Sequence, residues 1–91
     1  MRLNWTRKAI SDLNRLYQFL AVINLRSAVN TLNSIEKAAY SLLESPRIGF
    51  RLEEFNPNDV RSLVVGGYVM RYLIKGEALY ILRIWHGKED R

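Results

Sequence analysis

Two arginines and a histidine are the side chains of this sequence best suited to chemistry on a phosphate. Arg61 and Arg83 each lie within an apolar run that has the composition of a buried strand, VRSLVV and ALYILRIW, and His86 directly follows the second run. A guanidinium group binds phosphate or carboxylate through paired hydrogen bonds, and histidine titrates close to neutral pH. Together the three could hold a scissile phosphate and transfer a proton during RNA cleavage.

Each of these side chains also has a purely structural interpretation. The arginines could form ion pairs with Glu53, Glu54 or Glu77, and a histidine that ends a strand is more often structural than catalytic. Because the chain has one histidine and no cysteine, we expect no metal site, and we expect no other cofactor.

The strands that carry these residues are predicted to form two hairpins. The turns are expected at Gly66-Gly67 and at Gly76-Glu77, because glycine suits the tight turns that connect neighbouring strands. Two-residue turns fix the register of the strands. They pair Val65 with Tyr68, Leu63 with Met70, Arg61 with Tyr72, Ile74 with Leu79, Tyr72 with Ile81, Met70 with Arg83 and Tyr68 with Trp85.

Side chains alternate along a strand, so this register divides the sheet into two faces. The predicted aromatic face holds Arg61, Leu63, Val65, Tyr68, Met70, Tyr72, Ile74, Leu79, Ile81, Arg83 and Trp85. His86 would project to the other face, which offers Val64, Val69, Leu73, Leu82 and Ile84 as a bed for helices. We therefore expect the aromatic face to remain uncovered and to bind a target or partner through Arg61, Tyr68, Met70, Tyr72, Arg83 and Trp85, with His86 at its end.

The first half of the chain is predicted to supply a short strand and two helices. RLNW (2–5) is a strand candidate, and Thr6 is a suitable residue to cap a following helix. Apolar residues then recur at helical spacing over 9–20 and again over 28–42, until Pro46 forbids further helix. NLRS (24–27) is too short to separate the helices, so they should form an antiparallel hairpin.

These elements give a single domain, 1–91, of the α+β class. It consists of an N-terminal strand, an antiparallel two-helix hairpin and then a three- to four-stranded antiparallel sheet, the fourth strand being a short one within RLEEFNPND (51–59). A net charge of +5 favours an acidic partner, or it only keeps the protein soluble. The sequence has no cysteine, no apolar run long enough to span a membrane and no signal-peptide pattern, so we expect a cytoplasmic protein without a membrane partner.

The order of these motifs resembles the RelE/ParE superfamily of toxins from bacterial type II toxin–antitoxin systems. The resemblance rests on WTRKAISDLNRLYQFL, on the turn Pro46-Arg47-Ile48-Gly49, on the strands VRSLVV and YVMRY, and on ILRIWHGKEDR, and it covers nearly the whole chain. It implies a small basic toxin of the kind linked to plasmid stabilisation. It also implies a hetero-oligomer with a cognate antitoxin, which wraps a disordered segment around the toxin.

The superfamily contains two activities. RelE-type toxins cut mRNA on the ribosome without a metal, using basic residues on the sheet, which Arg61, Arg83 and His86 would match. ParE-type toxins inhibit DNA gyrase and trap its cleaved complex. No tyrosine follows His86, and Glu53 and Glu54 stand where RelE-type ribonucleases tend to be basic. We therefore predict a ParE-type gyrase inhibitor with no catalytic residues. The alternatives are a ribosome-dependent endoribonuclease and a relative of the fold that has lost toxicity.

Overall fold

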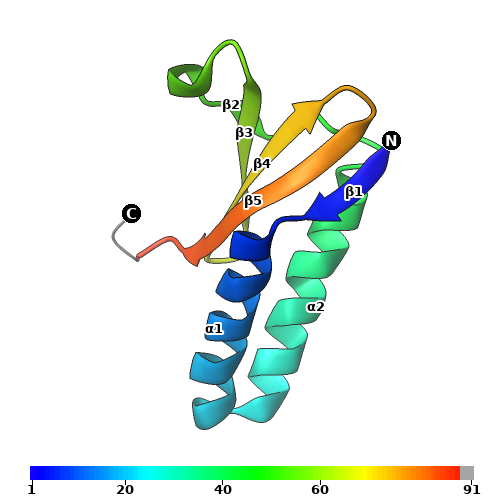
Figure 1. The fold of residues 1–91 in the computed structure, drawn as a ribbon. Helices are drawn as coiled ribbons and strands as arrows, with labels where there is room; N and C mark the ends of the chain where they lie inside the picture. The colour runs from blue at the N-terminus through cyan, green and yellow to red at the C-terminus, as the bar shows by residue number, and fades with distance from the viewer. Residues whose placement is uncertain (89–91) are drawn as a thin grey trace.

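One sheet unites the two ends of the chain, and a helical hairpin packs against one of its faces (Figure 1). The computed structural model describes residues 1–88. Its elements are β1 (Arg2–Trp5), α1 (Arg7–Ile23), α2 (Leu25–Ser41), β2 (Phe50–Arg51), the 3-10 turn η1 (Glu53–Phe55), β3 (Asp59–Val65), β4 (Tyr68–Lys75) and β5 (Ala78–His86). None of the helices within residues 1–88 is long and apolar enough to cross a membrane.

The two predicted helices are present and form the predicted hairpin. Thr6 caps α1, since its Oγ1 accepts a hydrogen bond from the backbone N–H of Ala9 at 3.1 Å. Asn24 alone separates the helices: its N–H donates to Leu20 at the end of α1, and its side chain accepts from Ser27 N–H at the start of α2. With a single residue between them, the helices must run antiparallel.

The sheet confirms the α+β class and extends it. Its five strands lie in the order β1-β5-β4-β3-β2, and β3, β4 and β5 form the two predicted hairpins. Gly66 and Gly76 both have a φ of 60°, the left-handed conformation that glycine adopts most readily in such turns. β2 is the predicted short fourth strand, although it begins at Phe50. β1 pairs in parallel with β5 at the opposite edge, a pairing that the sequence pattern did not predict.

The predicted register holds until the middle of β5. β3 and β4 pair as predicted, and Tyr72 lies opposite Ile81 across the second hairpin. Leu82 then has no partner, and the register resumes with Arg71 opposite Arg83. This extra residue is a β-bulge, so every later side chain of β5 points to the face opposite the one predicted.

The pairs predicted beyond the bulge are therefore wrong. Met70 lies opposite Ile84 rather than Arg83, and Tyr68 lies opposite His86 rather than Trp85. His86 and Arg83 lie on opposite faces of the sheet, as predicted. However, His86 shares the face of Met70 and Tyr68, on which Arg83 was predicted, and Arg83 lies on the face predicted for His86.

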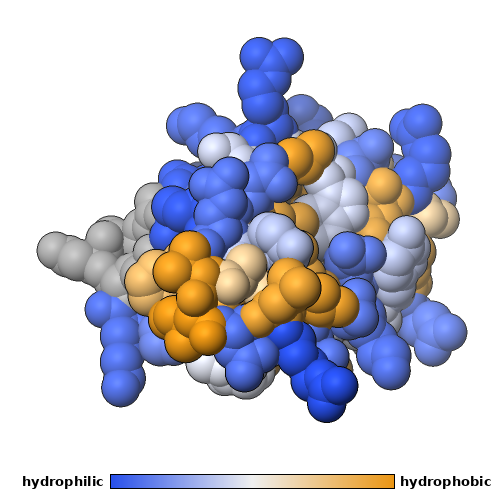
Figure 2. All heavy atoms as spheres, turned by 90° about the horizontal axis from the view of Figure 1, so that it is seen from below, coloured by the Kyte–Doolittle hydropathy of each residue, from blue (hydrophilic) through white to orange (hydrophobic). Residues whose placement is uncertain are grey.

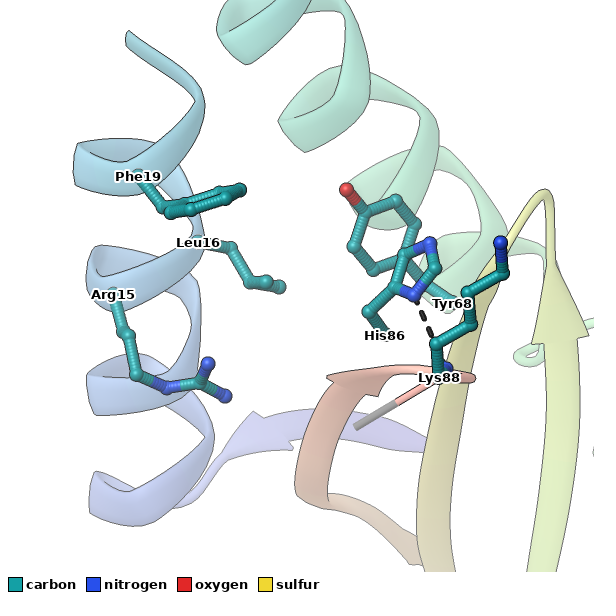
Figure 3. A pocket seen from close by; sticks show the side chains of 6 residues that line it. All are labelled: Arg15, Leu16, Phe19, Tyr68, His86 and Lys88. Carbon is teal, nitrogen blue, oxygen red and sulfur yellow. Dashed lines mark hydrogen bonds between the residues drawn. The ribbon is translucent and has the colours of Figure 1, made fainter. Parts of the chain in front are cut away.

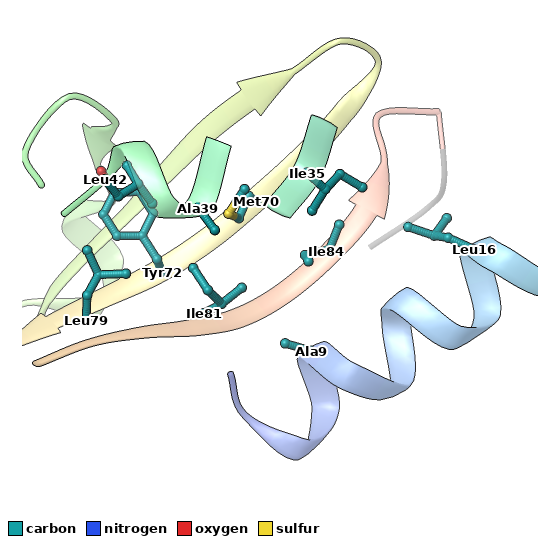
Figure 4. Packing of buried hydrophobic residues seen from close by; sticks show 10 residues of the cluster. All are labelled: Ala9, Leu16, Ile35, Ala39, Leu42, Met70, Tyr72, Leu79, Ile81 and Ile84. Atoms are coloured by element: carbon teal, nitrogen blue, oxygen red, sulfur yellow. The ribbon is translucent and has the colours of Figure 1, made fainter. Parts of the chain in front are cut away.

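The face that the helices cover is also the reverse of the predicted one. Its buried side chains pack against the apolar stripes of α1 and α2 (Figure 4). The cluster comprises Ala9, Leu16, Ile35, Ala39, Leu42, Met70, Tyr72, Leu79, Ile81 and Ile84. The small side chains of Ala9 and Ala39 on the helices and the larger side chains of Tyr72 and Met70 on the sheet belong to the same close-packed core. On the predicted bed, by contrast, Val64 is 61% exposed.

Candidate functional site

Arg83 lies on the uncovered face of the sheet and is held by Asp12 of α1. Its Nε and Nη2 donate to the two carboxylate oxygens of Asp12 at 2.8 and 3.1 Å. The Asp12 carboxylate is buried, whereas the Arg83 side chain is 30% exposed. The hydrogen bonds to Asp12 raise the pKa of Arg83 further above its usual value. Arg83 is therefore a fixed cation with one side open to solvent.

The start of α1 brings Asp12 to this position. Thr6 Oγ1 donates to the carbonyl of Ile81 at 2.8 Å, which fixes the first turn of the helix against β5 beside the bulge. Two turns of helix later, the Asp12 carboxylate also accepts the backbone N–H of Ile84 at 2.9 Å. The buried carboxylate thus accepts hydrogen bonds both from the Arg83 side chain and from a strand amide.

Arg61 lies on the other face of the sheet, so the two arginines do not share a surface. Its Nε donates to Asp59 at 2.9 Å, and its Nη1 donates to the carbonyls of Arg47 and Gly49 at 3.1 and 2.9 Å. Its side chain is only 14% exposed. The prediction of a joint anion clamp is wrong, because Arg61 ties the turn after α2 to β3. For both arginines the partner is an aspartate, not one of the predicted glutamates.

Tyr72 of β4 is fully buried and also binds the turn after α2. Its hydroxyl donates to the carbonyl of Pro46 at 2.8 Å and accepts the N–H of Gly49 at 2.9 Å. A Cβ atom added at Gly49 would lie 2.7 Å from both that hydroxyl and the carbonyl of Ser62, so only glycine fits there. Tyr72 and Met70 lie in the core, so the expectation that they line an uncovered surface is wrong.

Arg71, which was not among the predicted site residues, lies beside Arg83. Its guanidinium carbon lies 5.1 Å from the ring centre of Phe55 and 5.0 Å from that of Trp85. These distances are typical of cation–π contacts. Its Nε is buried and makes no hydrogen bond within residues 1–88. Trp85 therefore lies on the uncovered face, as predicted, where it holds a cation.

A cavity of about 440 Å³ opens beside these side chains. We call it the basic pocket; it is lined by Thr6, Arg7, Lys8, Phe55, Arg71, Leu82 and Arg83. No lining residue is acidic, and four are cationic. Arg83 is thus part of a basic site, as predicted, but its neighbours there are the first turn of α1 and Arg71 rather than Arg61.

His86 and Tyr68 face the helical side, where they line a second cavity of about 480 Å³ (Figure 3). We call it the His86 pocket; it is lined by Arg15, Leu16, Phe19, Tyr68, His86 and Lys88. The two rings meet edge to face, 5.2 Å between centres, and His86 Nδ1 accepts the N–H of Lys88 at 3.1 Å. His86 is therefore not in the basic pocket, and no group of three or more possible metal ligands occurs within residues 1–88.

The His86 pocket adjoins an apolar surface at the end of the helical hairpin. Figure 2, which looks onto that end, shows apolar side chains gathered there. The exposed ones include Phe19, Val22, Ile23 and Leu25, with exposed fractions of 66, 88, 70 and 58%. We call these four the hairpin tip. So much exposed apolar surface on a small domain marks an interaction site.

Comparison with known proteins gives matches over nearly the whole chain. The family model of the ParE toxin of the type II toxin–antitoxin system parDE matches residues 3–91. A Caulobacter vibrioides protein, Toxin RelE1, is 32% identical over 84 residues, covering 92% of this chain and 90% of that protein. The solved structure titled "Chromosomal ParDE TA system from P. aeruginosa" is similar with a TM-score of 0.77 and 28% identity. The similarity covers 94% of this chain and 95% of the chain in that structure.

Proposed function

The chain belongs to the ParE toxin family of type II toxin–antitoxin systems, and on that premise we propose that it inhibits DNA gyrase and is neutralised by a cognate antitoxin. The gyrase assignment follows the ParE type rather than the RelE type of the superfamily. Because gyrase acts on the chromosome, the proposal places the toxin in the cytoplasm.

The choice of gyrase inhibition over RNA cleavage rests on the separation of Arg61 from Arg83. Cleavage of RNA by the predicted residues requires Arg61, Arg83 and His86 to converge on one phosphate, within hydrogen-bond reach of the reacting atoms. Arg61 is instead bonded to Asp59 and to the turn after α2, and His86 lies in a different pocket from Arg83. The nuclease constellation is therefore not assembled, and an inhibitor that acts by binding fits the geometry better.

The hairpin tip and the His86 pocket support the proposal of an antitoxin partner. The sheet face that was expected to receive it is filled by the helices of the chain itself. The hairpin tip and the pocket offer exposed apolar side chains, with Arg15 and Lys88 at the pocket's margin. A segment with apolar anchors and acidic neighbours would match this surface in both shape and charge.

An endoribonuclease is the second candidate, because a specific observation favours it. The Caulobacter vibrioides relative is called Toxin RelE1, and a basic pocket does open on the uncovered sheet face. In that case Arg71 and Arg83, rather than Arg61 and Arg83, would contact the phosphate.

Two assays on the purified chain separate these candidates. One measures supercoiling by gyrase, with detection of trapped cleaved DNA, and the other measures mRNA cleavage on programmed ribosomes. We expect loss of supercoiling with accumulation of cleaved DNA, and intact mRNA. Cut mRNA together with normal supercoiling would replace the gyrase proposal by the nuclease one, and inactivity in both assays would remove both.

A further inference from the structure

The basic pocket gathers positive charge that the fold itself does not neutralise. Arg7, Lys8, Arg71 and Arg83 line it, and Asp12 accounts for one of these four charges by pairing with Arg83, which leaves a net charge of +3. Within residues 1–88, no carboxylate lies within ion-pair distance of the other three. Unneutralised charges of one sign around a cavity concentrate counter-ions of the other sign there.

Two of the cations are held in place before any ligand arrives. Asp12 fixes Arg83 through two hydrogen bonds, and the rings of Phe55 and Trp85 enclose the guanidinium of Arg71. An arginine that is already ordered loses less side-chain entropy when it binds a ligand. The pocket is therefore preorganised for an anion.

The other two cations occupy an unfavourable position in their helix. Arg7 and Lys8 are the first two residues of α1, and its first turn holds no acidic residue. The N-terminus of a helix carries partial positive charge, so cations there destabilise the helix where aspartate or glutamate would stabilise it. This cost is offset when an anion occupies the pocket. The helix terminus then adds its own positive potential to that of the four side chains.

The aromatic rings and the uncovered position point to a polymer backbone as the ligand. Phe55 and Trp85 border the cations on an uncovered sheet face, and grooves that combine cations with aromatic rings bind nucleic acid strands. We propose that the basic pocket binds a backbone phosphate of DNA and that, under the proposed function on which this assignment rests, the DNA is the segment that gyrase has cut. The toxin then contacts the nucleic acid of the cleaved complex as well as the enzyme.

The test measures binding of the purified chain to fluorescent oligonucleotides by anisotropy over a series of salt concentrations. Single-stranded DNA, duplex DNA and RNA of one sequence are compared, with a poly-glutamate peptide as a competing anion. We expect Arg7→Gln and Lys8→Gln each to weaken DNA binding about 3- to 10-fold. Each should also reduce the slope of log affinity against log salt by roughly 0.7 to 0.9, as expected for the loss of one phosphate contact.

Lys37→Gln is the matched control, because it removes the same charge from α2, away from the pocket. Equal weakening by all three substitutions would reduce the effect to net charge and overturn the site. Absence of DNA binding, or binding of poly-glutamate or RNA alone, would overturn the DNA assignment. Arg71→Lys keeps the charge but loses the planar group between the rings, and we expect it to weaken binding while the melting temperature confirms folding.

The gyrase assay distinguishes failure of this inference from failure of the proposed function. If the wild-type chain and the Arg7→Gln/Lys8→Gln double variant inhibit gyrase equally, the DNA contact is wrong and the function stands. If the wild-type chain binds DNA through the pocket but leaves gyrase active, the pocket stands and the gyrase proposal fails.

Discussion

Asp12 and Arg83 are 71 positions apart in the sequence, and they form an ion pair between the helical hairpin and the sheet, at 2.8 Å. The same carboxylate accepts the backbone N–H of Ile84, so one aspartate holds both a side chain and the backbone of β5 against α1. Arg83 is accordingly part of the fold and part of the basic pocket. We therefore expect its loss to affect both stability and binding.

We predict that Asp12→Ala lowers the free energy of unfolding by about 2–4 kcal/mol, because it leaves the amide of Ile84 and the guanidinium of Arg83 without their acceptor. Urea unfolding followed by circular dichroism measures this. Arg15→Ala is the control: Arg15 lies 3.8 Å from the same carboxylate and its side chain is 43% exposed, so its loss should cost less than about 1 kcal/mol. Equal effects of the two substitutions would contradict the central role of the Asp12–Arg83 pair.

Arg61→Ala should destabilise the protein by about 2–3 kcal/mol without weakening DNA binding, because Arg61 holds the carbonyls of Arg47 and Gly49 and lies on the helical side of the sheet. Arg51 on the neighbouring strand offers a comparison: its side chain is 43% exposed and lies 3.9 Å from Asp59, and its hydrogen bonds to Asn56 and Pro57 are exposed to solvent. Arg51→Ala should change stability by less than about 1 kcal/mol. A stable Arg61→Ala variant that no longer binds DNA would restore the sequence-based hypothesis.

We predict that the buried Tyr72 hydroxyl makes the folded protein less stable as the pH becomes alkaline. Burial raises the pKa of its hydroxyl, an effect that the hydrogen bond from Gly49 partly opposes. The folded protein therefore keeps the phenol proton at pH values where the unfolded chain has lost it. The stabilisation is complete below the ordinary tyrosine pKa of about 10 and decreases as the pH rises towards the folded pKa, with a slope of at most about 1.4 kcal/mol per pH unit.

The measurement is urea unfolding at a series of pH values from neutral to strongly alkaline. Tyr72→Phe is the control: it should be less stable at neutral pH by about 1–3 kcal/mol, because Pro46 and Gly49 lose their partner. It should also lose less stability than the wild type as the pH rises. Parallel curves for the two proteins would show that Tyr72 does not titrate differently in the folded state.

For the antitoxin, we predict that Phe19→Glu weakens the complex at least about 10-fold, because it places a charge in the apolar hairpin tip next to the His86 pocket. Calorimetric titration with the antitoxin encoded beside the toxin measures the affinity. Ile48→Glu serves as the control, since Ile48 is equally exposed at 65% but lies in the turn after α2. If both variants bind as the wild type does, the antitoxin uses another surface.

Local sequence pattern was sufficient to predict most of the fold. Thr6 begins a helix, Pro46 prevents one, and two glycine turns set the strand register as far as Ile81. Local pattern failed at Leu82, because one additional residue in an antiparallel pair leaves no mark in an apolar run that continues through it. The wrong placement of Arg83 follows from that single residue.

The covered face was mispredicted because both faces of the sheet are apolar, so alternation alone did not distinguish them. A signal was nevertheless present in the helices. Ala9 and Ala39 lie on their buried stripes, and small residues there call for large partners such as Tyr72 and Met70 on the sheet. Asp12 on the same stripe indicated a buried carboxylate in need of a cation, although the sequence could not show that this cation was Arg83.

The parallel pairing of β1 with β5 has a consequence for the timing of toxicity. β5 is synthesised after the other strands that the structure describes, yet it lies between β1 and β4 and supplies Leu79, Ile81 and Ile84 to the interior. A nascent polypeptide that ends before this strand lacks the strand that joins β1 to β4, so it cannot cover the apolar side of its helices. The fold can therefore form only after translation has passed β5, so we expect a polypeptide that terminates before Ala78 to have no toxic activity.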